Sequence, residues 1–446
     1  MYVHFYYRYR PYRHPRCCHK SFVFVPIIKL LQKMTDGPPK ASKVNATNDD
    51  DKNFAEFVAA CFSKDEEAAV AAVVAGFDVN AFSEPYITPI GRATCGGYLA
   101  LVTAILDANG DVNLALPTNK RTALHHACQH GSIAIVNVLI AAGAKINGNM
   151  DASSATPLTE ACKLGSIEVV TALIEAGADV NQFLGCSPFY LACHRLHFEV
   201  AAALLAAGAD VNANNHAGDT ALHIAASDGE LAMVKMIVGA GADVNAVGAF
   251  DRTPLFGTCK SSNTEVARFL LAAGADVMAV ADEGQTLLHC AVWAPEALNL
   301  FIEAGADVDA VASGNTTALY LATEASPEAV VALLKAGADP NVTTEWSSDT
   351  ALSFACQDGG EAAALALIEA GAKVQVSDST GNTPLHYACA AGCDAVAVAL
   401  VDAGADVFAV SSNGHTPGDM AASPELRALV VDRGNGTPGR DALGIR

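Results

Sequence analysis

The chain has 446 residues and a formal net charge of −21, and 51% of its residues are hydrophobic although only 7% are aromatic. Residues 1–40 hold eight basic residues and one acidic residue, so residues 41–446 carry a net charge of −28, from 19 basic and 47 acidic residues. A body this acidic repels nucleic acids and anionic membranes, which excludes both as expected partners and favours protein partners with neutral or basic surfaces.

Residues 1–53 differ from the rest of the chain. Residues 1–33 are aromatic and basic, and no acidic residue precedes Asp36. The apolar run at residues 21–31 is shorter than the roughly 20 residues that span a bilayer, and no small-residue cleavage site follows it, as a signal peptide requires. Three interpretations of residues 1–33 stay open: a disordered extension, a translated leader upstream of a true start at Met34, and a mitochondrial targeting sequence. Residues 35–53 are polar and contain prolines, which predicts disorder.

From residue 54 onward a single pattern recurs. A Thr or Ser that opens a short apolar run returns at spacings of 31 to 34 residues. It stands at Thr88, Thr122, Thr156, Ser187, Thr220, Thr253, Thr286, Thr317, Thr350, Thr383 and Thr416. A Gly-Ala-Asp-Val-Asn signature recurs in step, for instance at 177–181, 208–212 and 241–245. A fixed period in this range predicts a stack of structural repeats.

One repeat, residues 216–245, illustrates the unit. Thr220 is a candidate N-cap, because its hydroxyl can accept hydrogen bonds from the free N–H groups of the first helical turn. In six repeats Pro follows the cap, where its missing N–H does no harm. Gly229 permits a turn between two short apolar helices, and Gly241 ends the second helix. The unit is therefore helix, turn, helix and extended loop, and it must stack on neighbours to bury enough apolar surface.

The sequence motifs Thr-Pro-Leu-His-x-Ala-Ala and Gly-Ala-Asp-Val-Asn resemble those of the ankyrin repeat. The resemblance covers about residues 54–431 and implies an all-α fold: a curved solenoid of about twelve helix-turn-helix repeats with projecting β-hairpin fingers. We expect a capping repeat at 54–80, ten central repeats at 81–411, a shortened capping repeat at 412–431 that ends near Val431, and a disordered tail at 432–446. In the first repeat, Ser63 to Glu66 reads as a capping box.

Six cysteines share one column of the predicted first helices: Cys128, Cys162, Cys193, Cys259, Cys356 and Cys389. Helices that pack about 8–10 Å apart hold such cysteines too far from one another for disulfides. We expect buried free thiols that act as small hydrophobic residues. Free thiols indicate a reducing compartment, so we expect the protein in the cytoplasm or nucleus.

The histidines of the repeat pattern, His125, His223, His289 and His386, are expected to be structural, because in the ankyrin family this side chain bonds the capping Thr and neighbouring loops. The Asn that closes the signature is expected to tie its loop to the next one; it stands at Asn113, Asn147, Asn181, Asn212, Asn245 and Asn341. His126 and His130 share a helix face, as two zinc ligands can, but no third ligand is evident at a fitting spacing. We expect no cofactor, no metal and no catalytic residues.

Function is then expected on the variable surface. In the ankyrin family, finger tips and exposed positions of the first helices line a concave groove, and aromatic and Arg side chains dominate binding energies. Reading these positions gives Tyr86, Arg121, Phe250 and Trp346 on or beside fingers, and Arg92, His126, Arg195, Trp293 and Tyr387 on first helices. We expect a monomeric, non-enzymatic scaffold or adaptor. The alternative is a regulatory inhibitor, or a substrate-receptor adaptor for a ubiquitin ligase, that uses the same groove.

Overall fold

A computed structural model describes residues 56–61, 63–80, 88–115, 120–148, 155–182, 185–260 and 264–434. The predictions of disorder at 1–53 and at the end of the tail lie outside the described residues. The chain forms two compact units, residues 1–157 and 158–446, and each is described by itself.

The first unit consists of short helices in pairs. Residues 56–61 are helical and are followed by α3 (Glu66–Val74), and the next two pairs are α4 (Pro89–Gly96) with α5 (Leu99–Asp107) and α6 (Ala123–His130) with α7 (Ile133–Ala141). First helices pack on first helices, as α4 does on α6, and second helices on second helices, as α3 does on α5 and α5 on α7. In the first pair Phe57 stacks on Phe77, with ring centroids 4.6 Å apart.

The predicted capping box in the first repeat is wrong. Lys64 adopts a φ of 60°, so the chain turns there and α3 begins only at Glu66. Asp65 is the N-cap residue, and its carboxylate accepts a hydrogen bond of 2.9 Å from the first turn of α3. The carboxylate of Glu66 instead accepts a hydrogen bond of 3.1 Å from the backbone N–H of Leu101 in α5. The acidic side chain therefore bonds the next repeat instead of its own N-cap.

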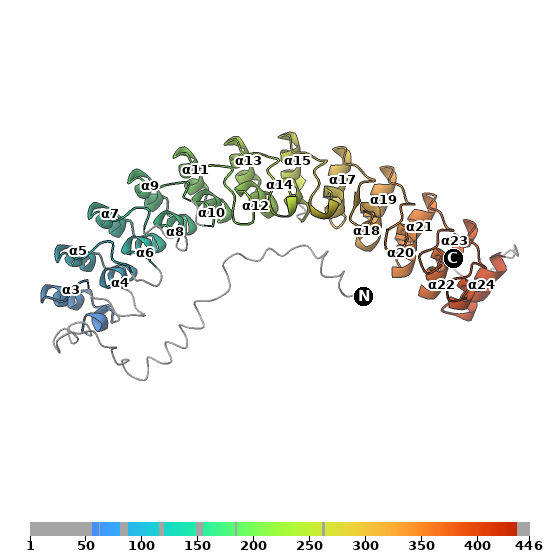
Figure 1. Ribbon diagram of the computed structural model, residues 1–446, viewed down its shortest axis with the longest axis horizontal. Coiled ribbons are helices and arrows are strands. Elements are labelled where there is room, and N and C mark those ends of the chain that lie inside the picture. Colours follow the sequence, from blue (N-terminus) through green and yellow to red (C-terminus); the bar gives the residue numbers. More distant parts are fainter. Residues whose placement is uncertain are drawn as a thin grey trace. The chain divides into compact units, whose positions relative to one another are not determined.

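The second unit continues the same pairing, with first helices along one side of the stack and second helices along the other (Figure 1). Its first helices are α8 (Pro157–Leu164), α10 (Pro188–His194), α12 (Ala221–Asp228), α14 (Pro254–Gly257), α16 (Leu287–Ala291), α18 (Ala318–Ala325), α20 (Ala351–Asp358) and α22 (Pro384–Ala391). Its second helices are α9 (Ile167–Glu175), α11 (Phe198–Ala206), α13 (Leu231–Gly239), α15 (Thr264–Ala272), α17 (Pro295–Glu303), α19 (Pro327–Lys335), α21 (Glu361–Glu369), α23 (Asp394–Asp402) and α24 (Pro424–Gly434).

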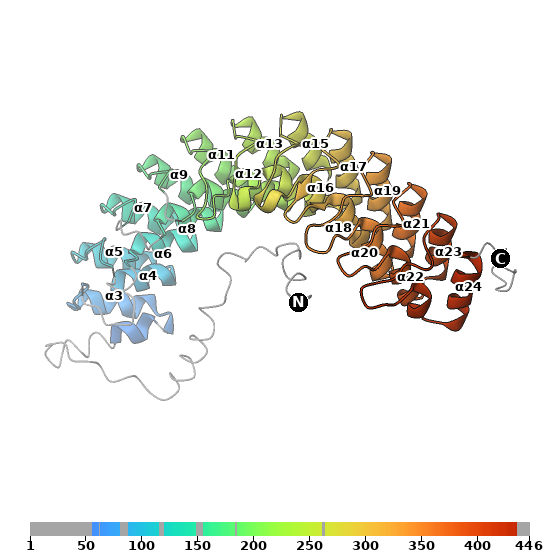
Figure 2. The ribbon, with the colours of Figure 1, turned by 45° about the vertical axis from the view of Figure 1, so that its right-hand side comes forward.

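Loops between the repeats project on the side of the first helices, as they do beside α18, α20 and α22 (Figure 2). One of them is a regular hairpin, in which β1 (Val311–Ala312) pairs antiparallel with β2 (Thr316–Thr317). Two others have single antiparallel bridges, between Asn214 and Thr220 and between Val280 and Thr286. Short 3-10 turns complete the loops and the last pair: η3 (Ala249–Asp251), η4 (Thr258–Lys260), η5 (Asp282–Gly284) and η6 (Pro417–Met420).

The repeat that opens at Thr286 is shorter than its neighbours, with 31 residues to Thr317 against 33 in the repeats on either side. The loss falls in its first helix: α16 has five residues whereas α12 has eight, and the turn that follows α16 is one residue longer than the turn that follows α12. Pro295 begins α17 directly, and a residue that precedes Pro disfavours the helical conformation. Trp293, which we predicted on a first helix, therefore lies in the turn after α16.

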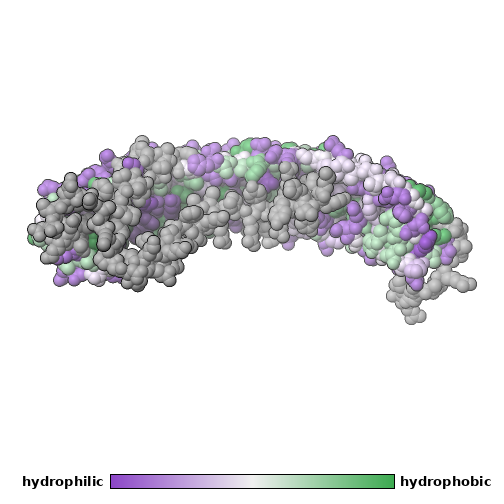
Figure 3. All heavy atoms as spheres, turned by 60° about the horizontal axis from the view of Figure 1, so that its bottom comes forward, coloured by the Kyte–Doolittle hydropathy of each residue, from purple (hydrophilic) through white to green (hydrophobic). Residues whose placement is uncertain are grey.

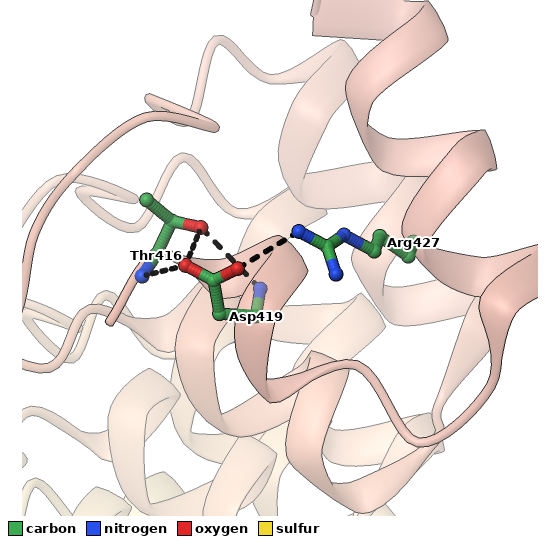
Figure 4. A network of polar contacts seen from close by, with 3 residues as sticks. All are labelled: Thr416, Asp419 and Arg427. Carbon is green, nitrogen blue, oxygen red and sulfur yellow. Dashed lines mark hydrogen bonds and ion pairs between the residues drawn. The ribbon is translucent and has the colours of Figure 1, made fainter.

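The last pair ends the array with its own polar network (Figure 4). Asp419 accepts hydrogen bonds from the backbone N–H and the hydroxyl of Thr416, at 3.1 and 2.8 Å, and forms an ion pair of 2.9 Å with Arg427 of α24. The bonds from Thr416, followed by the charge of Arg427, lower the pKa of Asp419. A carboxylate thus takes the place that His holds in other repeats, and α24 continues to Gly434, past the expected end near Val431.

The packing predicts a contrast between two adjacent valines of α19. Val330 is fully buried, whereas Val331 is 36% exposed. Val330→Ala removes buried methyl groups and leaves a cavity, so it should lower the free energy of unfolding by about 2 kcal/mol. Val331→Ala makes the same chemical change at an exposed site and should cost well under about 1 kcal/mol. Urea denaturation followed by circular dichroism measures both, and equal losses would contradict the packing described.

Candidate functional site

The loops that precede the first helices of the second unit are here called fingers. They comprise residues 213–219, 246–252, 279–285, 310–316, 342–349, 376–382 and 409–415. Consecutive fingers are joined through their backbones: Ser313 donates to Glu283 O at 2.8 Å, Glu345 to Gly314 O at 3.0 Å, Ser379 to Ser347 O at 2.7 Å, and Ser412 to Thr380 O at 2.9 Å. From Glu283 to Ser412 these bonds make one continuous frame beside the first helices.

The candidate residues of the first unit are half-buried rather than fully exposed. Arg92 lies on α4 and His126 on α6, and Arg121 immediately precedes the cap of α6. The guanidinium of Arg121 donates a hydrogen bond of 2.9 Å to the side chain of Gln129. Tyr86 lies outside the described residues.

The candidates of the second unit lie in five repeats. Arg195 is exposed at the C-cap of α10, and Phe250 is exposed at a finger tip with a φ of 58°. Trp293 is 55% exposed in the turn after α16, and Trp346 is 50% exposed on the finger at 342–349. Tyr387 is half-buried on α22. Trp346 and Tyr387 belong to consecutive repeats whose fingers are joined, whereas the other three are spread over separate repeats.

Trp346 packs on the finger before its own. A Cβ atom on Gly314, which has a φ of 73°, would lie 1.3 Å from Cζ3 of the Trp346 ring. Only glycine leaves room there, so the ring rests against bare backbone. One face of the ring is thereby held in place, while half of the side chain stays accessible.

Acidic residues surround the aromatic residues of these repeats. Asp378, on the finger at 376–382, accepts hydrogen bonds from Thr380, Asn382 and the hydroxyl of Tyr387. Burial alone would raise the pKa of Asp378, but these hydrogen bonds outweigh it and lower the pKa. Burial and the bond to Asp378 raise the pKa of Tyr387 to about 12.

Asp349, at the end of the preceding finger, is buried, and its Oδ1 has no hydrogen-bond partner among the described residues. Burial raises the pKa of Asp349, the nearby charge of Asp378 raises it further, and a hydrogen bond with Ser347 opposes the rise. A second acidic pair lies on the neighbouring first helices, where partial burial of the carboxylate and the charge of Asp358 raise the pKa of Glu324, although its side chain as a whole is exposed. None of these four carboxylates was among the residues we predicted.

The pattern histidines form bonds within and between repeats. In the second unit, Nδ1 of His223 accepts from the backbone N–H of Thr220 at 3.0 Å, and its Nε2 lies 3.0 Å from the carbonyl of Arg252 in the next finger. His289 repeats this arrangement with Thr286 and with Thr316 O. Since Nδ1 accepts a hydrogen bond, the proton is on Nε2 and the ring is neutral. Burial lowers the pKa of both histidines.

Where Tyr replaces the pattern histidine, a different contact joins the repeats. The hydroxyl of Tyr190 accepts a hydrogen bond of 3.0 Å from Asn215 of the next finger. Tyr320 packs against Phe354 of the next first helix, with ring centroids 4.9 Å apart. These two replacements of the pattern histidine therefore keep contact with the neighbouring repeat.

The predicted role of the signature asparagines is confirmed where their bonds are described. The side-chain oxygen of Asn245 accepts from the N–H of Asp276 at 2.8 Å, and its amide donates to Gly274 O at 3.1 Å. Asn181 makes the same two bonds to Asp210 and Gly208. Asn113, Asn212 and Asn341 each accept from the corresponding N–H of the next repeat.

Comparison with known proteins decides the family. A family model described as ankyrin repeats (three copies) matches residues 56–150, 90–184, 180–248, 240–312, 255–344 and 318–411, which together cover most of the chain. The protein belongs to the ankyrin repeat family. Its helix pairs, caps and signature bonds are those of about twelve ankyrin repeats, and the ankyrin fold class expected from the sequence is confirmed. Ankyrin repeats form protein–protein interaction domains.

Two solved ankyrin structures are similar to parts of the chain. The ankyrin repeat domain of human ASB11 is 32% identical over 48% of this chain and 97% of that domain, with a TM-score of 0.44. The ankyrin repeat domain of Bcl-3, a member of the IkappaB protein family, is 30% identical over 47% of this chain and 97% of that domain, with a TM-score of 0.43. No curated protein sequence matches the chain.

The six cysteines of the first-helix column are confirmed as buried free thiols. All eleven described cysteines are free, and the six of the first-helix column are buried. Burial raises the pKa of Cys162, Cys193, Cys356 and Cys389 to about 12. A thiol with a raised pKa holds little thiolate at neutral pH, so these cysteines are poor nucleophiles.

The described ankyrin repeats show neither metal-site geometry nor a membrane span. His126 is half-buried and His130 exposed, both on α6, and no three His, Cys, Asp or Glu residues among the described ones are grouped to hold an ion. Within the same residues, no helix combines the length and apolarity needed to cross a bilayer. The groups available to a ligand on the fingers and first helices are aromatic side chains that lie beside carboxylates, on fingers that are joined by backbone hydrogen bonds.

Sequence reasoning missed the carboxylates because it searched for aromatic and Arg anchors only. A visible signal was present: residues 310–325, 342–359 and 376–392, which form the fingers and first helices of three consecutive repeats, contain five acidic residues and no Lys or Arg. What the sequence could not reveal was the burial of Asp349.

The buried neutral histidines predict a pH dependence. Their pKa lies below the ordinary value in the folded protein, so below a pH of about 6.5 the unfolded chain takes up protons that the native state lacks. The free energy of unfolding should therefore fall as the pH falls through this window. His289→Gln keeps a side chain that can cap the helix but does not titrate, so its stability should fall less steeply with pH. Denaturant titrations from pH 7.5 to 5 compare it with His130→Gln, which alters an exposed histidine and should behave like the wild type.

Proposed function

We propose that this protein is a non-enzymatic scaffold or adaptor that holds partner proteins against the fingers and first helices of its ankyrin repeats. The observation that carries the proposal is that both tryptophans of the chain are about half exposed, Trp346 on a finger and Trp293 in the turn that follows the first helix α16. An accessible tryptophan on a rigid frame is the residue type that contributes most often and most strongly to binding energy. The frame of joined fingers keeps the ordering cost of binding low.

The free thiols support a reducing compartment, and we propose that the protein acts in the cytoplasm or nucleus. Its acidic body favours partners with neutral or basic surfaces. The proposal assigns no catalytic step to any residue.

The test uses the full chain as bait in affinity purification followed by mass spectrometry, which supplies the partner set. Changing both tryptophans, Trp293→Ala and Trp346→Ala, should weaken the interaction with a direct partner by about tenfold or more, because an interface anchor costs about 2 kcal/mol or more when truncated. Isothermal titration calorimetry measures the change.

The matched control is Phe198→Ala, which removes a 38%-exposed aromatic side chain at the start of the second helix α11. It should leave the affinity unchanged. If the partner binds the wild type and the double variant with equal affinity, the tryptophans do not anchor the interface. A partner set dominated by ligase subunits, or one composed of a single enzyme, would favour the substrate-receptor or inhibitor alternative over a general scaffold.

A further inference from the structure

Three consecutive repeats of the second unit combine negative charge with aromatic surface on one side. Their fingers and first helices, residues 310–325, 342–359 and 376–392, are here called the acidic face. Its acids are Glu324, Glu345, Asp349, Asp358 and Asp378, and the face contains no Lys or Arg to neutralise them. In Figure 3 apolar surface, in green, lies among polar surface on the C-terminal repeats. Clustered charge of one sign raises the local concentration of opposite charge.

Asp349 is the residue of this face whose bonding is incomplete. It is only 7% exposed, and its Oδ1 has no hydrogen bond among the described residues. The equivalent residue in an earlier repeat, Asp219, accepts a hydrogen bond of 3.0 Å from Ala249 of the next finger. At Asp349 that bond is absent because the corresponding N–H, of Ser379, donates to Ser347 O. The carboxylate bonds Ser347, but a buried carboxylate oxygen without a partner is costly, and positive charge brought close by a partner would relieve that cost.

The neighbouring Asp378 cannot take the same role. Its Oδ1 already accepts bonds from Thr380 and Asn382, and its Oδ2 accepts the hydroxyl of Tyr387. Asp378 therefore adds negative potential beside Asp349 while its own acceptor sites are occupied. Among the described residues of the face, Oδ1 of Asp349 is the buried side-chain oxygen that lacks a hydrogen bond.

The indole ring of the face narrows the chemistry of the incoming group further. Along the finger at 342–349, Trp346 directly follows Glu345 and lies three residues before Asp349. Trp346 thus stands between two acids of the face, with half of its side chain accessible. A Lys or Arg side chain packs favourably over an indole ring, and Arg in addition matches the geometry of a carboxylate.

We propose that the acidic face binds an extended segment of a partner protein that carries Arg and Lys side chains, one of which lies over the finger at 342–349 and offsets the buried charge of Asp349. This inference rests on the proposed function and names the chemistry of the partner. Further cations of the segment pair with Glu324, Glu345 and Asp358, which are exposed. The aliphatic part of a cationic side chain covers the accessible half of Trp346.

The test uses the full chain with Trp293→Phe, which leaves Trp346 as its only tryptophan and makes the fluorescence of that residue the readout. The probe is a synthetic peptide in which arginine alternates with serine, compared with peptides that carry glutamine or glutamate in place of arginine. The arginine peptide should change the emission of Trp346 on binding, and the other two should not. An arginine peptide that leaves the emission unchanged would overturn the inference.

A matched pair of triple variants separates this face from general attraction to an acidic protein. Glu324→Gln, Glu345→Gln and Asp358→Asn neutralise three exposed acids of the face, and the Kd for the arginine peptide should rise about tenfold or more. The control neutralises three exposed acids of second helices, Glu328→Gln, Glu361→Gln and Glu369→Gln, and should change the Kd by less than about twofold. Equal effects of the two variants would overturn the inference.

Asp349→Asn gives a second, independent readout. Because this variant lacks the charge of Asp349, it should bind the arginine peptide more weakly than the parent does. The free variant should melt at a higher temperature than the parent, because the raised pKa of Asp349 means that folding disfavours its charged form. A lower melting temperature would indicate that the carboxylate is already satisfied within the fold, which would overturn its role as a buried charge that the partner offsets.

Two further outcomes identify other occupants. The full chain with Arg8, Arg10, Arg13 and Arg16 changed to Ser should bind the arginine peptide as the parent does; tighter binding would mean that the chain's own basic segment occupies the face, against the assignment to a partner. If a captured partner binds the double tryptophan variant more weakly but binds the acidic triple variant as tightly as the parent, the proposed function stands and the assignment of a basic partner segment is overturned. If the partner binds both variants as tightly as the parent, the proposed function and the inference about the acidic face both fail.

Discussion

Each repeat is completed by its neighbour, and this dependence is the constraint on which the structure rests. The side chain of Asn245 bonds two backbone groups of the following loop, and the ring of His223 joins its own capping Thr to the carbonyl of Arg252 in the next finger. Buried polar groups require such partners, and here the partner lies about one repeat further along the chain. Stability is therefore distributed over nearest-neighbour contacts, as in other solenoids.

Because the structural bonds occupy fixed columns, the remaining positions are free to carry binding chemistry. The acidic face uses that freedom at a cost, since Asp349 is buried beside Asp378 with one oxygen that no described group bonds. Strain or unmet bonding of this kind gathers at functional sites and persists because the surrounding structure supports it. The joined fingers supply that support, and Gly314 gives Trp346 a flat backbone surface on which to rest.

The sequence predicted the features that recur and missed those that occur once. The capping residues, the signature asparagines and the buried cysteines each repeat at one position, so many copies report the same environment. Ser63 was mistaken for a cap because the positive φ of Lys64 leaves no trace in the residue types. Trp293 was placed on a helix because a repeat shortened by two residues does not reveal where the loss falls. The burial of Asp349 depends on how two neighbouring fingers meet, which no single repeat encodes.

The cysteines give the array a built-in set of reporters. A buried thiol stands at the same position of six repeats, five of them in the first helix and Cys259 in the 3-10 turn η4 that follows α14, and each becomes accessible to an alkylating reagent only when its own repeat opens. Labelling rates resolved by peptide mapping would thus chart local opening along the chain without any introduced probe. A solenoid held together by neighbours alone need not open everywhere at once, and these sulfur atoms are placed to record where it begins.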